Sequence, residues 1–339
     1  MQSLSEENPR AGLSVGLWQI PDLQIGGYDV LASKSHPLSQ AKLQGLFSRR
    51  TLELISRAIP AIVFLAPATI SFILFRYYPL VRGIYMSFFR WDSATPPGTF
   101  IGFENYVNAL TSEHFYLLLK NTLILFVFGV LCGFWVPIAQ ALILHQLRRG
   151  YQAFRFLYVL PVAVPSMAFL MTWMFIWYPD SGVANALMRV LGLPEQAWIA
   201  DPKLVKLCLR IPGLMGGGVG ILIYTAAIQN ISEEVVEAAI VDGATALQRT
   251  LKIILPNILP IINIMFVISL TQSLLAFEDV WIMTQGGPGY ASSTLVIGVY
   301  QRAFVQHQYG MGSAWAVLIL ILTLAFTWIR LKTMSDERY

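Results

Sequence analysis

The sequence predicts an all-α integral membrane protein, and this prediction rests on composition and on the length of the apolar stretches. Of 339 residues, 56% are hydrophobic and only 12% are charged, and the mean hydropathy is +0.60. A soluble domain carries about a quarter charged residues. The chain also holds several apolar stretches near the roughly 20 residues that a helix needs to cross a bilayer. They lack the alternation of a transmembrane β-strand, so α-helices are the expected spanning structure.

Six apolar segments are expected to span the membrane. They are Ile59–Tyr78, Leu119–Leu144, Phe156–Trp177, Leu204–Ile228, Ile258–Ile282 and Gly312–Ile329. An even number places both termini on one side, and most of the 23 Lys and Arg residues fall on that side. The loop with Arg148, Arg149 and Arg155 holds no acid. By the positive-inside rule, both termini are therefore expected to be cytoplasmic.

The polar N-terminal stretch, the net charge and the aromatic residues give further expectations. Residues 1–54 are mixed and polar, without the ordered regions of a signal peptide, and are expected to form a loosely ordered cytoplasmic N-terminal extension before a membrane domain at 55–335. The net charge of +4 does not indicate nucleic-acid binding, because the basic residues flank apolar spans and suit membrane lipid. Rings near the outer ends of the first and third spans are expected at the membrane interface: Tyr77, Tyr78, Trp91, Trp173, Trp177 and Tyr178.

The stretch Ile231–Pro260 is too polar for lipid and reads as a helix-turn-helix outside the membrane. Ser232 can cap a first helix whose opening turn holds Glu233 and Glu234, where carboxylates meet the positive end of the helix dipole. Gly243 can end this helix. A second short helix is expected from about Ala246 to Pro256. An ordinary amphipathic loop helix is the alternative interpretation.

The full spacing of this stretch is more specific than a loop helix. Its motif residues are Glu237, Ala238, Ala239, Asp242 and Gly243, followed by Ile253, Leu255 and Pro256. In this arrangement the chain resembles permease subunits of binding-protein-dependent ABC importers. The resemblance implies a six-helix permease core with cytoplasmic coupling helices, in which residues 231–260 form a coupling loop inserted into a separate ATPase subunit. It implies that Glu237, Ala238, Ala239, Asp242, Gly243, Leu255 and Pro256 serve this coupling.

Further stretches resemble the sugar-importing branch typified by maltose and glycerol-phosphate permeases. They are Gly102–Tyr106, Asn121-Thr122, Leu157–Pro161 and Thr284–Gly289. The resemblance covers roughly residues 55–335. It implies import of a sugar or oligosaccharide across the bacterial cytoplasmic membrane, with a second permease subunit, two ATPase subunits and an extracytoplasmic solute-binding protein as partners. Glycerol phosphate or another polar solute is the alternative, less favoured because no basic cluster is evident within the spans.

The chain is expected to be a non-catalytic subunit without cofactors. It has no Gly-x-x-x-x-Gly-Lys-Ser/Thr loop, so ATP is expected on the partner subunits. The four histidines show no metal-ligand spacing, and no nucleophile has a base beside it. An isolated channel would leave the coupling stretch without a purpose. A membrane enzyme would need paired ionisable groups, and only Glu278 and Asp279 come close, at the outer end of the fifth span, where a solvated interface is expected.

Two spans carry candidate solute-path residues. Ser269, Gln272, Ser273 and Ala276 share one helical face of the fifth span, which suits sugar hydroxyls. These residues differ in kind from the face of the maltose-type permease, so another sugar is expected. The fourth span is rich in glycine, which fits either close helix packing or an unwound wall beside the solute. In the second case Met215, Gly216 and Val219 would face the path.

Overall fold

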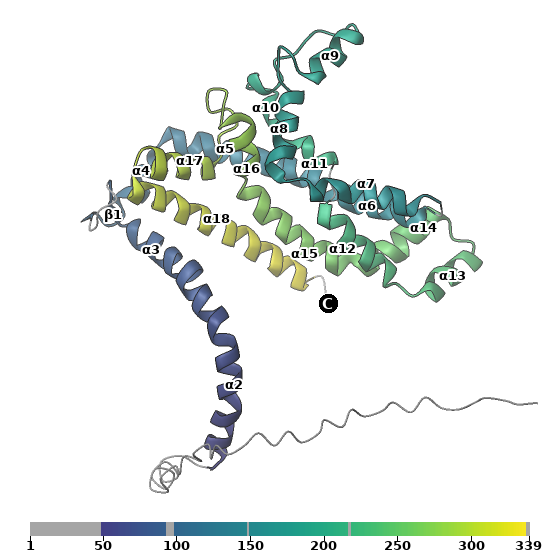
Figure 1. The fold of residues 1–339 in the computed structure, drawn as a ribbon, viewed down its shortest axis with the longest axis horizontal. Coiled ribbons are helices and arrows are strands. Elements are labelled where there is room, and N and C mark those ends of the chain that lie inside the picture. Colours follow the sequence, from purple (N-terminus) through teal and green to yellow (C-terminus); the bar gives the residue numbers. More distant parts are fainter. Residues whose placement is uncertain (1–48, 93–97, 148, 216–217, 337–339) are drawn as a thin grey trace, which may run out of the picture. The chain divides into compact units, whose positions relative to one another are not determined.

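The computed structural model describes residues 49–92, 98–147, 149–215 and 218–336, and it is almost wholly helical (Figure 1). Within these ranges, the strands β1 (Phe89–Arg90) and β2 (Thr99–Phe100) form an antiparallel ribbon in which Phe89 pairs with Phe100. Residues 1–70 and 71–339 form two units. The expected extension, residues 1–54, lies mostly outside the described ranges, and its last residues already belong to the first described helix.

The helices follow one another in this order. The first half of the chain holds α2 (Arg49–Phe72), η1 (Ile73–Tyr77), α3 (Tyr78–Met86), α4 (Glu104–Thr111), α5 (Glu113–Phe128), η2 (Gly129–Phe134), α6 (Trp135–Gln146), α7 (Tyr151–Ala163) and α8 (Ser166–Ile176). The second half holds α9 (Val183–Val190), η3 (Trp198–Ala200), α10 (Val205–Arg210), α11 (Pro212–Met215), α12 (Gly218–Gln229), α13 (Glu233–Val241), α14 (Ala246–Arg249), η4 (Thr250–Ile254), α15 (Leu255–Leu274), α16 (Glu278–Thr284), α17 (Leu295–Tyr300), η5 (Gln301–Val305) and α18 (Tyr309–Asp336).

The described residues contain four helical stretches that are long and apolar enough to cross a membrane. They are Pro60–Met86, Glu113–Gln146, Ala246–Leu274 and Tyr309–Thr333. Two bent pairs also qualify: α7 and α8 meet at 97°, and the helix Val205–Met215 meets α12 at 42°. If each bent pair is one span, the total is the six that the sequence predicts. The third and fourth of these predicted spans are each broken into two helices.

Proline and glycine account for both breaks. Pro165 follows Val164, which is extended with ψ of 130°, because a residue before proline is driven out of the helical region. In the fourth span, Pro212 begins α11 two residues after α10 ends, and α12 begins at Gly218 with φ of +48°. That positive φ favours glycine, since side chains with a Cβ are strained there. Both breaks therefore follow from the local sequence, through its proline and glycine residues.

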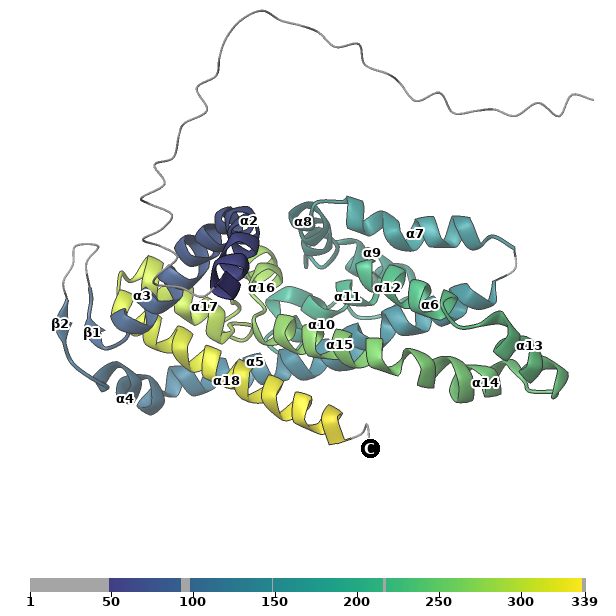
Figure 2. The ribbon, with the colours of Figure 1, turned by 90° about the horizontal axis from the view of Figure 1, so that it is seen from below.

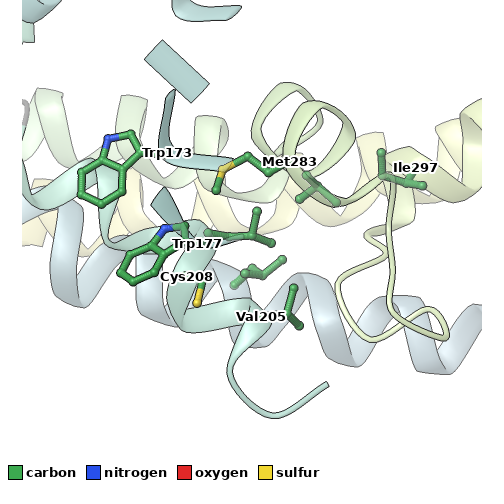
Figure 3. Close-up of a cluster of buried hydrophobic side chains, with 9 residues drawn as sticks. Trp173, Trp177, Val205, Cys208, Met283 and Ile297 are labelled. Atoms are coloured by element: carbon green, nitrogen blue, oxygen red, sulfur yellow. The ribbon is translucent and has the colours of Figure 1, made fainter. Parts of the chain in front are cut away.

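Neighbouring helices of the second unit pack through apolar clusters. The helix α12 packs against α6, α7 and α15, and α15 also packs against α18 (Figures 1 and 2). A cluster joining α8, α10, α16 and α17 includes Trp173, Trp177 and Cys208, and it is shown in Figure 3. Trp91, Trp173 and Trp177 are buried in protein and do not face the outside of the chain, and their interfacial depth stays a prediction.

One of the short sequence stretches that resemble sugar permeases, Asn121-Thr122, bonds to the segment that follows another of them, Thr284–Gly289. Asn121, on α5, donates from Nδ2 to the carbonyl oxygens of Tyr290 at 2.8 Å and Ser293 at 3.1 Å. Its neighbour Thr122 accepts the backbone N–H of Leu295 through Oγ1 at 2.9 Å. These bonds tie the second span to the loop between α16 and α17. Asn105, from another of the stretches, similarly holds the carbonyls of Ser87 and Phe89.

We predict that Asn121→Leu destabilises the protein, because two carbonyls of the α16–α17 loop lose their donor inside a buried site. Leaving a buried polar group unbonded costs about 1–3 kcal/mol. Thermal unfolding of the protein in lipid nanodiscs should show a lower apparent Tm. Asn108→Leu, at an exposed position of α4, is the matched control and should leave Tm nearly unchanged. Equal Tm values for the two variants would mean that other contacts hold the loop.

Candidate functional site

A cavity of about 610 Å³ lies where several of the spanning stretches are interrupted. Its wall includes Pro161 and Val164 beside the break of the third span, and Pro212, Gly213 and Gly218 on the two sides of the break of the fourth. The second span contributes Gly129, which opens the π-helical turn η2. Irregular backbone at membrane depth is tolerated where it lines a cavity or is buried in protein, and this arrangement meets that condition.

The last turns of α15 supply the polar side of the cavity. Ser269, Gln272 and Ser273 all lie in its wall. None of these side chains is hydrogen-bonded to another described residue, so their hydroxyl and amide groups are free to bond a solute or water. Ala276 is not on the same helical face, because α15 ends at Leu274. It lines a neighbouring cavity of about 400 Å³ instead.

The fourth span meets the cavity through residues other than the expected ones. Met215 and Val219 are 64% and 56% exposed and do not line it, and Gly216 lies outside the described residues. Gly213 and Gly218 line the wall in their place. The break in the span turns these two glycines toward the cavity, whereas a regular helix would have presented a different face.

An ion pair that sequence reasoning missed also lies in the wall. Arg210, the last residue of α10, donates from Nη1 to Oδ2 of Asp279, in the first turn of α16, at 3.0 Å. The side chains are only 14% and 20% exposed. Arg210 Nε and Nη2 are buried and have no hydrogen-bond partner among the described residues. The wall therefore contains a fixed guanidinium, whose Nε and Nη2 are enclosed by protein atoms.

The sequence contained a signal for this pair. Arg210 is a charged residue inside an apolar segment two positions before Pro212, and an ionisable residue within a span is a functional-site candidate by default. Sequence reasoning instead counted Arg210 with the basic residues outside the membrane. It also placed Asp279 at a solvated interface, which is wrong because the carboxylate is largely buried against Arg210. Glu278 is exposed as expected, and its carboxylate accepts a hydrogen bond from the Ser166 hydroxyl.

Gly129 lets two of the cavity groups approach the second span. A Cβ added to this glycine would lie 2.8 Å from Ser273 Oγ and 3.9 Å from Arg210 Cζ. Any side chain at this position would therefore push Ser273 aside and crowd the guanidinium. Gly133, one turn further and also in the wall, has no atom within 4 Å of an added Cβ. Only the first of these glycines is sterically required.

The second candidate site is the turn after α13. Gly243 has φ of +78°, and its N–H donates to the Ile240 carbonyl at 3.0 Å. The N–H of Ala244 donates to the Ala239 carbonyl at 2.9 Å. These are the two bonds of a Schellman motif, which ends a helix at a left-handed glycine. Thr245 then caps α14 through a capping box with Gln248.

Two local expectations for this segment are wrong. Ser232 stands at the N-cap of α13, but its side chain makes no capping bond. The second helix does not end at Pro256, because α14, η4 and α15 run as one helix, Ala246–Leu274. Pro256 lies in the first turn of α15, directly after the π-helical turn η4. Such local π-adjustment satisfies the backbone groups that a proline frees, so the helix continues.

The motif residues divide by exposure. Exposed positions are Glu237, Ala238, Asp242, Gly243 and Pro256, whereas Ala239 is buried and Leu255 is half-buried against the cluster of α6, α12 and α15. Beside the exposed glycine, Val241 is 87% exposed, and Ile240 and Leu247 are also exposed. A group of exposed apolar side chains at a tight turn is typical of a protein interaction site. No group of three or more His, Cys, Asp or Glu among the described residues could hold a metal ion.

Comparison with known proteins gives consistent matches. A family model described as the inner membrane component of binding-protein-dependent transport systems matches residues 126–339. The sulfoquinovosyl glycerol transport system permease protein of Agrobacterium fabrum is 31% identical over 85% of this chain and 94% of its own. The arabinooligosaccharides transport system permease protein of Bacillus subtilis is 29% identical over 88% and 94%. A solved chain of a bacterial ABC transporter involved in the import of the acidic polysaccharide alginate has a TM-score of 0.76 at 26% identity, covering 85% of this chain and 99% of that one.

The family match covers more than half of the chain, including both ends of the Arg210–Asp279 pair, the polar residues of α15 and the Gly243 turn. The solved structure extends the likeness in fold over most of the remainder. The protein therefore belongs to the family of inner membrane components of binding-protein-dependent transport systems.

Proposed function

We propose that this permease translocates a sugar or an oligosaccharide through the larger cavity. The observation that carries the proposal is the set of unbonded polar groups of Ser269, Gln272 and Ser273 in a cavity walled by broken spans. Discontinuous helices around a midplane site are a recurring transporter device. The names of the relatives, which refer to arabino-oligosaccharides, sulfoquinovosyl glycerol and alginate, support a saccharide as the solute.

The proposed assembly contains a second permease chain, two ATPase subunits and an extracytoplasmic solute-binding protein. ATP would be bound by the ATPase subunits, and this chain would hold no cofactor. The second permease chain would pack beside Met215 and Val219, which lie outside the cavity wall and whose high exposure fits a surface that awaits a partner. The solved alginate transporter was determined with a saccharide-bound periplasmic protein, which supports delivery of solute by a receptor.

The Gly243 turn would lie on the cytoplasmic side of the membrane and dock onto an ATPase subunit there. The exposed Glu237, Ala238 and Asp242 would contact the partner together with the apolar side chains of the turn. Ala239, Leu255 and Pro256 would support the shape of the segment without contacting the partner. The bias of Lys and Arg toward this side, including Arg149 between α6 and α7 and Arg155 on α7, supports cytoplasmic termini and a cytoplasmic coupling segment.

Glycerol phosphate is the second candidate solute, because Arg210 is a basic residue within the spans that lines the cavity. This residue was not identified from the sequence alone. A phosphate would need a positive site. Arg210 already pairs with Asp279, which weakens this candidate relative to a saccharide.

We predict that Gly243→Asp leaves the protein in the membrane but prevents stable binding of the ATPase subunit. A side chain at φ +78° strains the turn and adds charge to an apolar docking surface. Co-purification of the ATPase from membranes measures the effect. Gly192→Asp is a matched control, since Gly192 also has positive φ with open space and ends α9 with the same pair of backbone bonds. Normal ATPase recovery with the Gly243 variant would refute the docking role.

We also predict that Gln272→Leu lowers solute transport or shifts solute preference while ATPase assembly is retained. A site that pairs hydroxyls discriminates strongly through the groups it leaves unbonded. A purely structural role would change only stability, by about 0.6 kcal/mol. Uptake of solute into proteoliposomes, with the purified receptor present, measures the transport rate and the solute preference. Thr271→Val is the control on the same helix, because the Thr271 hydroxyl bonds the Val267 carbonyl and lies outside the cavity wall. Unchanged uptake and solute ranking would remove this face from the path.

A further inference from the structure

The larger cavity and the smaller cavity beside it share part of their walls. Leu170, Arg210, Gln272 and Asp279 line both the larger cavity and the neighbouring one of about 400 Å³. The Arg210–Asp279 pair therefore stands at the boundary between the cavities. A solute that moves from one to the other passes the only ionisable side chains that the described wall of the larger cavity contains.

The guanidinium of Arg210 is held in a defined orientation. Its Nη1 is bonded to Asp279, and its Cζ lies over Gly129 beside Ser273. The remaining donors, Nε and Nη2, lie on one edge of the planar group and are buried without a partner among the described residues. These two atoms are out of reach of a solute, so the geometry of the guanidinium alone does not distinguish a carboxylate-bearing solute from a neutral sugar.

Local charge separates these ligands. In the larger cavity Asp279 offsets the charge of Arg210, and in the smaller one the carboxylate of Glu278 adds a second negative charge. An anionic solute would thus meet no net positive charge, and it would approach two carboxylates in a medium where Coulomb interactions are much stronger than in water. A neutral saccharide would meet no such repulsion.

We propose that Asp279 is a specificity-determining residue that makes this cavity selective for uncharged polyhydroxyl solutes and excludes anionic ones. The inference rests on the proposed function, because it names the solute class of the same cavity. Asp279 orients Arg210 as a hydrogen-bond donor and cancels its charge. The site thereby differs from one suited to acidic saccharides such as alginate, the solute of the solved relative.

The charge filter is tested with thiol reagents, independently of any saccharide. Ser273→Cys serves as the reporter, with Cys132 and Cys208 replaced by serine, in the complete transporter in nanodiscs. Reaction rates are measured with a neutral hydroxyethyl and an anionic sulfonatoethyl methanethiosulfonate of similar size. We expect the anionic reagent to react about tenfold more slowly relative to the neutral one than it does with a free thiol. Adding Asp279→Asn should raise the anionic-to-neutral ratio by about tenfold.

Matched variants separate charge from structure. Asn is close in size to Asp and keeps an oxygen that accepts from Arg210, so the link between α10 and α16 is preserved. Glu195→Gln breaks the exposed Arg189–Glu195 pair instead and should leave the ratio unchanged. Ser269→Cys is the second reporter and Asp279→Ser the second neutral substitution, should the first variants fail to assemble with the ATPase. A ratio unaffected by neutral substitution at Asp279 overturns the proposal.

Equilibrium binding to the same complexes tests the solute class. The wild type should bind arabinotriose or maltotriose in preference to trigalacturonate, and Asp279→Asn should increase trigalacturonate binding. If the wild type prefers trigalacturonate, the inference is overturned while the saccharide function stands. If no saccharide binds to any form and the thiol ratios still behave as expected, the charge filter stands and the saccharide function fails.

Discussion

Every backbone N–H and C=O group at membrane depth needs a hydrogen-bond partner, and this requirement governs where the spans of the protein can be interrupted. The break at Val164, the start of α12 at Gly218, the π-helical turn at Gly129 and the last turns of α15 all border the same cavity. The π-helical turn η1 in the first span lies outside this wall, and such local adjustment keeps backbone groups bonded within the helix. The cavity is thus one place where irregular backbone is tolerated, and the irregular backbone in turn provides its small, closely approaching walls.

The helix Ala246–Leu274 connects the two candidate sites. It begins three residues after Gly243 and ends beside the polar residues that line the cavity. At 1.5 Å per residue, the distance along it from Ala246 to Gln272 is about 40 Å. Displacement of its first turns by a docked ATPase would be transmitted along one continuous element. Its packing against both α12 and α18 would spread that motion to the fourth and sixth spans.

Features set by local rules could be predicted from the sequence, and features set by long-range packing could not. Hydropathy locates the spans, and the left-handed turn follows from Gly243 itself. The polar face of Ser269, Gln272 and Ser273 follows from helical spacing. Arg210 and Asp279, however, are 69 residues apart, and the packing of α10 against α16 brings them together. The burial of Trp173 depends in the same way on helices distant in sequence.

The polar side of the cavity wall and the apolar clusters consist of different residues, although Leu209 belongs to both the wall and a cluster. Ser269, Gln272 and Ser273 belong to none of the three buried clusters. Most destabilising substitutions act on buried packing. Replacements at these three positions therefore remove no contact within the clusters, so the chemistry of the cavity can diverge in evolution while the packing of the scaffold is inherited intact.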